Sequence, residues 1–346
     1  MFLISTHVSV IIVNYNGHHL LRECLPTVLD QDYPNYEVVV FDNGSKDKSV
    51  RLLNIEYPQV KVFSNSENLG FAGGNNKAVS LVESEYIILL NNDTKVARNF
   101  ISTLVESIEK NPNIVSVAPR IVRPKGANLD GPQFSHDGFL VPFSYFFFAK
   151  RYENMLMRSH ICLANAGTAV LYRRSSFLNA GGFDEDFFAT FEDFDLGWRL
   201  ALRGELSLYV PETLVWHKGG STTQMKPIFS RFYIRNMLST YFKNLETINM
   251  ITHIFPMIVF MPILLASRCL VSRVSFFFCT MKNRMFHGSL TVKRAFPEKN
   301  FVASVQGIFS FLFQLKKIHN KRSLIQQSRK LTDKEVFCHT EQKSLL

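Results

Sequence analysis

The first 120 residues repeat one pattern, an apolar run followed by a stretch with helical spacing, and this repeat constrains the fold most. Val8–Asn14 (VSVIIVN) is a near-continuous apolar run of the kind buried in a parallel sheet. Further β-rich runs occupy residues 37–41, 60–64, 86–90 and 114–118, and helical patterns occupy residues 20–29, 46–57, 75–82 and 99–110. The alternation predicts an open, twisted, mostly parallel sheet with helices on both faces.

The remaining chain changes character twice. Residues 120–160 predict a long loop region, after which residues 163–172 and 206–210 predict strands and residues 191–203 a helix. Beyond residue 230 the pattern becomes helical and basic, and the end of the chain is polar. We therefore expect an α/β domain over residues 1–235, a basic, apolar helical region over 236–330 and a mobile polar tail over 331–346.

The charge lies mainly in the second of these regions. The 346-residue chain has a formal net charge of +10, and residues 230–330 hold 16 Lys and Arg against two acids. Apolar runs at residues 254–266 and 301–315 are each followed by cations, as in interfacial helices that dock on anionic lipid. Both are shorter than the ~20 apolar residues of a span. We expect peripheral or re-entrant association with an anionic membrane surface, ahead of a transmembrane helix or a buried helical core.

Other classes of protein receive little support. No nucleic-acid-binding motif occurs, so no nucleic-acid partner is expected. The five cysteines are scattered without disulfide or zinc spacing, which suits a reducing compartment. The apolar start lacks a basic leader and a cleavage site, so we interpret it as the first strand and not as a signal peptide.

Polar residues follow the first two strands, at the sheet edge where ligands of such folds bind. The first strand is followed by Asn14, Tyr15, Asn16 and Gly17, and the second by Asp42, Asn43, Gly44 and Ser45. Turn chemistry explains either loop alone. Two in succession favour a nucleotide pocket, in which Asp42 accepts hydrogen bonds from a base or ribose and Tyr15 forms a flat apolar wall.

Two later loops point to a diphosphate and a cation. Residues 68–76 (NLGFAGGNN), with Asn68, Gly70 and Asn75, open a helix where glycines would let backbone amides approach a diphosphate, although the signal is weak alone. Asn91, Asn92 and Asp93 directly follow the apolar run YIILL. Asp93 is well placed to hold a divalent cation, and an Asx turn explains the same tetrapeptide equally well.

Six acids lie between Asp184 and Asp195, interleaved with phenylalanines, which is unlike a solvated acidic face. Carboxylates held beside apolar walls have tunable basicity. Asp195 and Arg199 are four residues apart on the predicted helix and should pair structurally. Glu192 and Asp193 at the helix start are better placed to face a cleft. His217 stands beside a glycine pair, where a structural role is the commoner one for a lone histidine.

Six ordered motifs together resemble the family-two glycosyltransferases with a GT-A fold, in particular the rhamnosyltransferase-type members. They are VSVIIVNYNG, VVVFDNGSKD, NLGFAGGNN, YIILLNNDT, GGFDEDFF with the following FEDFDLGWR, and WHKGGS. The resemblance covers roughly residues 5–240, about two-thirds of the chain.

The resemblance implies transfer of a sugar, with inversion, from a nucleotide-diphosphate donor to a saccharide acceptor. Asp42 would bind the nucleoside in a pocket lined by Asn14 and Tyr15, and Asp193 beside Glu192 would be the general base. Asp93 would coordinate Mg²⁺ or Mn²⁺, with His217 as a further metal or diphosphate ligand. Asn91 replaces the first acid of the family's D-x-D motif, which leaves one carboxylate there.

The donor sugar and the acceptor are less constrained. The resemblance suggests rhamnose as the sugar, and the basic, apolar region suggests a lipid-linked acceptor of a surface polysaccharide at the cytoplasmic face of the membrane. A sugar-nucleotide nucleotidyltransferase is the alternative enzyme, but the loop after the first strand lacks that class's basic cluster. A non-catalytic, membrane-bound nucleotide-sugar-binding protein is the other alternative, and the presence of Asp93, Asp193 and His217 together weighs against it.

Overall fold

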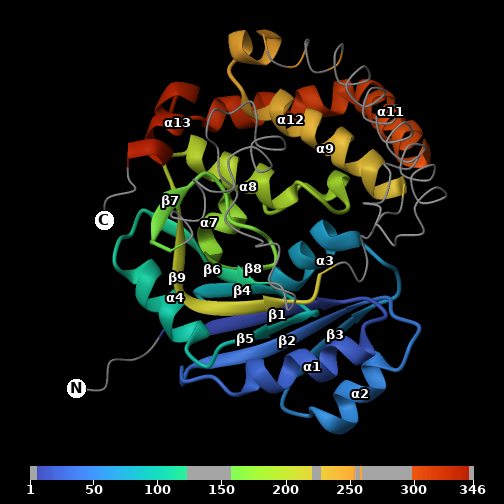
Figure 1. Ribbon diagram of the computed structural model, residues 1–346, viewed down its shortest axis with the longest axis vertical. Helices are drawn as coiled ribbons and strands as arrows, with labels where there is room; N and C mark the ends of the chain where they lie inside the picture. The colour runs from blue at the N-terminus through green and yellow to red at the C-terminus, as the bar shows by residue number, and fades with distance from the viewer. Residues whose placement is uncertain are drawn as a thin grey trace, which may run out of the picture. The chain divides into compact units, whose positions relative to one another are not determined.

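The computed structural model describes residues 6–122, 157–219, 227–252 and 298–342, together with Ile254 and Ile258. Two compact units make up the chain (Figure 1). Unit 1 comprises Met1–Ser221 and Ser328–Leu346, and unit 2 comprises Thr222–Gln327. Most of the predicted loop over residues 120–160 lies outside the described residues, as does most of the apolar run over 254–266.

In the described residues, unit 1 contains a nine-stranded sheet with the order β3-β2-β1-β4-β8-β6-β9-β5, and β7 also pairs with β9. The strands are β1 (Val8–Asn14), β2 (Tyr36–Asn43), β3 (Lys61–Asn65), β4 (Tyr86–Asn91), β5 (Thr94–Val96), β6 (Ile114–Val122), β7 (His160–Cys162), β8 (Ala169–Arg173) and β9 (Leu206–His217). Strands β1 to β4 are mutually parallel, whereas β8 runs antiparallel to β4 and β6. The carboxyl ends of β1, β2 and β4 therefore meet at one edge.

Helices cover both faces of this sheet (Figure 1). One face packs against α1 (His18–Leu29), α2 (Ser49–Glu56) and α4 (Phe100–Glu109). The other packs against α3 (Gly70–Val79), α7 (Arg174–Asn179) and α8 (Glu192–Leu202). Strand β1 serves both layers because successive side chains alternate: Val10 and Ile12 enter the first core, and Ile11 enters the second.

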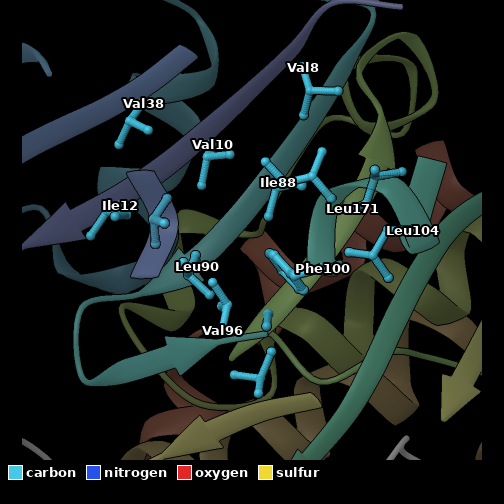
Figure 2. Close-up of a cluster of buried hydrophobic side chains, with 14 of the residues drawn as sticks. Val8, Val10, Ile12, Val38, Ile88, Leu90, Val96, Phe100, Leu104 and Leu171 are labelled. Atoms are coloured by element: carbon cyan, nitrogen blue, oxygen red, sulfur yellow. The ribbon is translucent and has the colours of Figure 1, made fainter. Parts of the chain in front are cut away.

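The first core shows how firmly the sheet is held (Figure 2). Val10 and Ile12 of β1 lie beside Ile88 of β4, and Phe100 of α4 packs into the same cluster. All four side chains are fully buried. At about 1.5–3 kcal/mol for each large apolar side chain removed from water, this layer provides a rigid base for the loops at the carboxyl edge.

The predicted α/β fold around a mostly parallel sheet is confirmed, with two local differences. Strand β9 continues to His217 instead of ending near residue 210, because it resumes pairing with β6 after a register shift between Val210 and Leu214. The strand predicted over residues 163–172 begins only at Ala169, and a separate short strand, β7, precedes it.

The end of the chain is folded where the sequence predicts a mobile tail. Asp333–Gln342 form helix α13, and the ring of Phe337 lies edge-on to the Trp198 ring of α8 at 5.8 Å. The backbone N–H groups of Lys330 and Leu331 donate to the carbonyl oxygen of Leu202, at the end of α8. The sequence does not predict this helix because its composition is polar and only a few of its side chains, such as Val336, are buried.

Unit 2 is helical in its described residues, with α9 (Pro227–Asn244), α11 (Glu298–Phe313) and α12 (Leu315–Ser328). Gly307 lets α11 approach α9 closely, since a Cβ there would lie 2.7 Å from the carbonyl oxygen of Arg231. Arg322 of α12 is buried and donates to the Leu245 carbonyl oxygen at 2.6 Å. None of the helices in the described ranges is both long and apolar enough to cross a bilayer.

Candidate functional site

The carboxyl ends of β1, β2 and β4 bring three of the predicted donor-binding residues together. Asn14 and Asp42 are register partners in the β1–β2 ladder, and the Asn14 Nδ2 group donates to Asp42 Oδ1 at 3.3 Å. The Nδ2 group of Asn92, just beyond β4, donates to Asn14 Oδ1 at 2.8 Å. A continuous polar row thus spans the ends of the three strands.

Ser45, for which the sequence pattern predicts no role, completes this row. The Ser45 backbone N–H donates to Asp42 Oδ2 at 3.1 Å, and its hydroxyl accepts the backbone N–H of Asn16 at 2.9 Å. The Asp-x-x-Ser spacing of a tight turn was the available signal. Asp42 and Asn14 are consequently buried and fixed in orientation, while Tyr15 beside them is exposed and can offer its ring to a ligand.

Gly17 allows α1 to start against this row. A Cβ at position 17 would lie 2.3 Å from Asn92 Nδ2 and 2.5 Å from Asn14 Oδ1. Both distances are far below any real contact, so a side chain there would displace the Asn14–Asn92 hydrogen bond. The close approach explains why glycine suits this position.

Asp93 and His217 meet at the end of the β5–β9 ladder. Thr94 pairs in register with His217, and His217 Nε2 lies 3.1 Å from Asp93 Oδ1. The Lys218 backbone N–H donates to the Asp93 carbonyl oxygen at 3.0 Å, which holds the two loops together. Both side chains are largely buried.

These two side chains fit a divalent cation that also binds a substrate. A carboxylate oxygen and an imidazole nitrogen are suitable donors, and Mg²⁺ in particular is usually held by one or two protein carboxylates plus phosphate oxygens and water. Within the described residues no group of three or more His, Cys, Asp and Glu side chains could hold a metal. A cation at Asp93 and His217 would therefore need oxygens from a ligand.

Asp193 stands at the same sheet edge as Asn91. Its Oδ2 accepts the Gly167 backbone N–H at 2.8 Å, and its Oδ1 accepts the Phe194 N–H at 2.7 Å. Thr168, which follows Gly167, accepts the Asn91 backbone N–H through its carbonyl oxygen at 2.9 Å. Two hydrogen bonds and a short stretch of backbone thus link the carboxylate of Asp193 to the loop that carries Asp93.

Glu192 differs sharply from its neighbour. The side chain is buried, and its Oε2 has no hydrogen-bond partner among the described atoms. Burial and the nearby Asp193 carboxylate raise the pKa of Glu192 well above its usual value. The two neighbours therefore differ: burial disfavours the charged form of Glu192, whereas the side chain of Asp193 accepts two backbone amides.

The turn before α8 adopts an unusual backbone conformation. Phe188, Thr190 and Phe191 have φ angles of 62°, 72° and 70°, a region that side chains other than glycine rarely enter. The Phe188 carbonyl oxygen accepts the N–H groups of Phe71 and Ala72 at 2.6 and 3.2 Å. The amino end of α3 thus stabilises the strained turn that orients Glu192 and Asp193.

This contact changes the interpretation of the glycine-rich loop. The backbone N–H groups expected to approach a diphosphate are already engaged, since Phe71 and Ala72 donate to Phe188 and Gly70 donates to Asn68 Oδ1. Gly70, at φ 75°, is needed because a Cβ would lie 2.5 Å from the Phe188 ring. Asn75 donates to the Phe71 carbonyl oxygen of its own helix. The loop therefore positions α8 in place of the expected diphosphate cradle.

Asn43 is a further residue for which the sequence pattern predicts no role. Its amide donates to the Gly70 carbonyl oxygen at 2.9 Å, and its Oδ1 accepts the Leu69 N–H at 3.0 Å. It thereby joins the end of β2 to the start of α3. The predicted structural pair of Asp195 and Arg199 is confirmed, with Arg199 Nε 2.9 Å from Asp195 Oδ2 in the buried interior.

Comparison with known proteins supports a common family. Residues 9–180 match the family model described as Glycosyl transferase family 2. An N-acetylglucosaminyl-diphospho-decaprenol L-rhamnosyltransferase of Mycobacterium tuberculosis is 29% identical over 240 residues, which are 63% of this chain and 78% of the relative.

Solved structures show the same fold. A mannosyltransferase from Pyrobaculum calidifontis, solved with GDP-Man and Mn²⁺, is similar with a TM-score of 0.55 and 16% identity over 98% of this chain and 87% of its own. GalNAc-T7, solved with UDP, GalNAc and Mn²⁺, is similar with a TM-score of 0.52 and 20% identity over 70% of this chain. This chain spans about half, 48%, of the GalNAc-T7 chain. The likeness shows the GT-A-type fold.

Proposed function

Through residues 9–180 this chain belongs to glycosyl transferase family 2, and from that premise we propose that it transfers a sugar, with inversion, from a nucleotide-diphosphate donor to a saccharide hydroxyl. The observation that carries the proposal is the linkage of Asp93, His217 and Asp193 through Asn91, Thr168 and Gly167 at one sheet edge. A cation-binding pair and a carboxylate on opposite sides of a bound sugar are what a single in-line displacement requires.

The polar row binds the nucleoside in this proposal. The Asp42 carboxylate is the acceptor for base or ribose groups, because Asn14 and the Ser45 backbone already hold it in one orientation. Tyr15, exposed next to it, stacks against the base. Asn91 and Asn92 line the neighbouring part of the pocket, and Asn92 transmits any displacement of Asn14 to the loop that carries Asp93.

In this proposal Asp93 and His217 would hold Mg²⁺ or Mn²⁺. A cation held by these two side chains would supply positive charge against the diphosphate leaving group, a large contribution to glycosyl transfer. Two similar folds were solved with Mn²⁺ beside a nucleotide or nucleotide sugar, which supports a divalent cation here. The absence of an acid at Asn91 leaves Asp93 as the carboxylate of this loop, so we expect cation binding to depend on the diphosphate.

Asp193 is the proposed general base. Its two backbone hydrogen bonds hold the carboxylate in place to accept a proton from the attacking hydroxyl, help worth about 10²–10⁴ in rate. Burial raises the pKa of Glu192, and its Oε2 has no hydrogen-bond partner among the described atoms, so we assign the role of proton acceptor to Asp193, which two backbone amides hold in place. The displacement needs no covalent intermediate on the protein, since attack and departure occur in one inverting step.

The acceptor is a lipid-linked saccharide of a surface polysaccharide, and the donor sugar is rhamnose. The relative from Mycobacterium tuberculosis is an L-rhamnosyltransferase whose name specifies N-acetylglucosaminyl-diphospho-decaprenol, which supports both assignments. The basic, apolar region after residue 230 suits work at the cytoplasmic face of an anionic membrane.

A two-stage assay on the full-length protein tests the proposal. Thymidine-, uridine- and guanosine-diphosphate sugars are first screened with Mn²⁺ for thermal stabilisation, since a bound donor raises apparent stability by about 2.7 kcal/mol at 100 times its Kd. The best donor is then incubated with a polyprenyl-diphosphate-linked N-acetylglucosamine. We expect stabilisation by one donor and release of its nucleoside diphosphate only with the acceptor. No stabilisation and no product with any donor would contradict the proposal.

A further inference from the structure

Helix α11 of unit 2 has two different faces. Ala303, Ile308 and Phe311 are buried, and the ring of Phe311 lies edge-on to Phe242 of α9 at 5.9 Å. These residues and Gly307 form the face that packs against α9. This side of α11 is therefore explained by helix packing.

The opposite face is exposed and apolar. Val302, Phe309, Leu312 and Phe313 are all exposed, and Phe313 reaches 88%. Together with the exposed Gln306, the positions 302, 306, 309 and 313 follow one another at intervals of four, three and four residues, which places them on one stripe of the helix. Single exposed apolar side chains are ordinary, but a stripe that includes two phenylalanines marks an interaction surface.

Cations follow directly on this stripe. Lys316 and Lys317 are exposed in the first turn of α12, and Lys321 follows one turn later. Over residues 298–322, the acids are limited to Glu298 at the start of α11. An anionic bilayer has negatively charged headgroups over an apolar acyl region. An apolar stripe next to a cationic cluster complements both, since the apolar side chains can enter the acyl region while the lysines stay at the headgroups.

The dimensions fit a helix that lies on the membrane. With 16 residues at about 1.5 Å each, α11 is about 24 Å long, short of the ~30 Å hydrocarbon core. The other face of α11 packs against α9, so α11 is also not free to insert across the bilayer as a single transmembrane helix. Burial of the stripe to the depth of the phenylalanine rings leaves the lysines at the headgroups.

We propose that the α11 stripe (Val302, Phe309, Leu312 and Phe313), with Lys316 and Lys317, docks unit 2 on an anionic lipid surface. This inference deepens the proposed function by naming the surface that reaches the membrane, and it depends on that function only for the lipid-linked acceptor. Lipid binding itself needs neither donor nor acceptor, so the two proposals can fail separately.

The test is co-sedimentation of the full-length protein with vesicles of phosphatidylglycerol or of phosphatidylcholine, without nucleotide. The variant Phe309→Glu/Phe313→Glu is compared with the charge-matched control Ile55→Glu/Leu178→Glu, which removes two exposed apolar side chains from unit 1. We expect the stripe variant to lose about tenfold or more in partition to phosphatidylglycerol, and the control to bind as wild type does. Lys316→Glu/Lys317→Glu should bind phosphatidylglycerol more weakly and with less salt dependence.

Three results would overturn the inference. One is wild-type partition to phosphatidylglycerol that the stripe variant retains, and another is no wild-type partition at all. The third is a fall in melting temperature in the stripe variant, or a wild-type dimer that this variant no longer forms, because the stripe would then be covered by this chain or by a second copy. Donor-induced thermal stabilisation of the same variants reports on the proposed function independently.

Discussion

His217 Nε2 lies 3.1 Å from Asp93 Oδ1, although the two residues are more than a hundred positions apart in the sequence. Neighbouring strands create this contact: β5 starts directly after Asp93, β9 ends at His217, and the two strands pair antiparallel. The hydrogen bond from the Lys218 backbone N–H to the Asp93 carbonyl oxygen also holds the loops that carry Asp93 and His217 together. The relationship puts an imidazole and a carboxylate together beside the carboxyl ends of the parallel strands.

Substitution Asp93→Asn tests this pair as a cation site. Asparagine keeps the size of the side chain but removes its charge, so a nucleoside diphosphate should stabilise the variant less in the presence of Mn²⁺. Loss of a residue that only hydrogen-bonds to a metal ligand lowers metal affinity by ~10-fold or more. Asp93 is a proposed direct ligand, so we expect at least that loss in Mn²⁺ affinity. Thermal shift with and without EDTA measures it. Equal Mn²⁺-dependent stabilisation of wild type and Asp93→Asn would contradict the assignment.

Substitution Asp195→Asn should act on stability. Asp195 is fully buried, and its loss leaves the Arg199 guanidinium in the interior without a charged partner. Removal of one member of a buried pair costs about 3 kcal/mol or more of unfolding free energy. Urea unfolding measures this cost, with Asp30→Asn as the control because Asp30 is exposed. A variant as stable as the control would show that the pair is dispensable.

Substitution Glu192→Gln should stabilise the protein increasingly as the pH rises. Because the pKa of Glu192 is raised in the folded protein, the folded state keeps this proton to a higher pH than the unfolded chain, which releases it above about pH 4.3. Above this pH the unfolded state binds fewer protons, so wild-type stability falls by up to ~1.4 kcal/mol per pH unit until the folded pKa is reached. Glutamine has no such penalty. Chemical denaturation of wild type and Glu192→Gln at pH 5 and pH 8 measures this effect. A difference in unfolding free energy between the two proteins that does not grow with pH would refute the prediction.

The folded end of the chain gives a further prediction. Replacement Phe337→Ala removes the ring that packs edge-on to Trp198, and we expect the unfolding free energy to fall by about 2 kcal/mol. Phe337→Leu keeps much of the volume and should cost less. Thermal denaturation of both variants measures the difference. If neither variant is destabilised, α13 does not support α8.

The sequence predicts the sheet well because its signals are local and strong. Apolar runs such as Val8–Asn14 are buried on both faces, and the rule that parallel strands end at one edge explains why polar residues at the carboxyl ends of β1, β2 and β4 lie close together. In the structure the side chains of Asn14, Asp42 and Asn92 form one hydrogen-bonded row. The roles of these residues in catalysis remain predictions.

The sequence predicts the supporting residues poorly because their contacts are long-range. The Phe188 carbonyl oxygen accepts hydrogen bonds from the amides of Phe71 and Ala72, more than a hundred residues earlier in the chain. No periodic pattern in the sequence predicts such a bond. Ser45 and Gly167 are small residues in turns, and their hydrogen bonds depend on where another loop lies. Composition likewise conceals α13, whose few buried side chains are surrounded by polar ones.

The most direct test of the whole account compares turnover and donor binding in Asp193→Asn. Asparagine can still accept a backbone N–H from Gly167 but cannot take a proton from the acceptor hydroxyl. With Asp30→Asn as the control, we predict that kcat falls by about 10²–10⁴ while the Kd of the nucleotide-sugar donor with Mn²⁺ stays within a factor of about three. Turnover by Asp193→Asn at the rate of the control would contradict the account, because the proposed reaction would then lack its base.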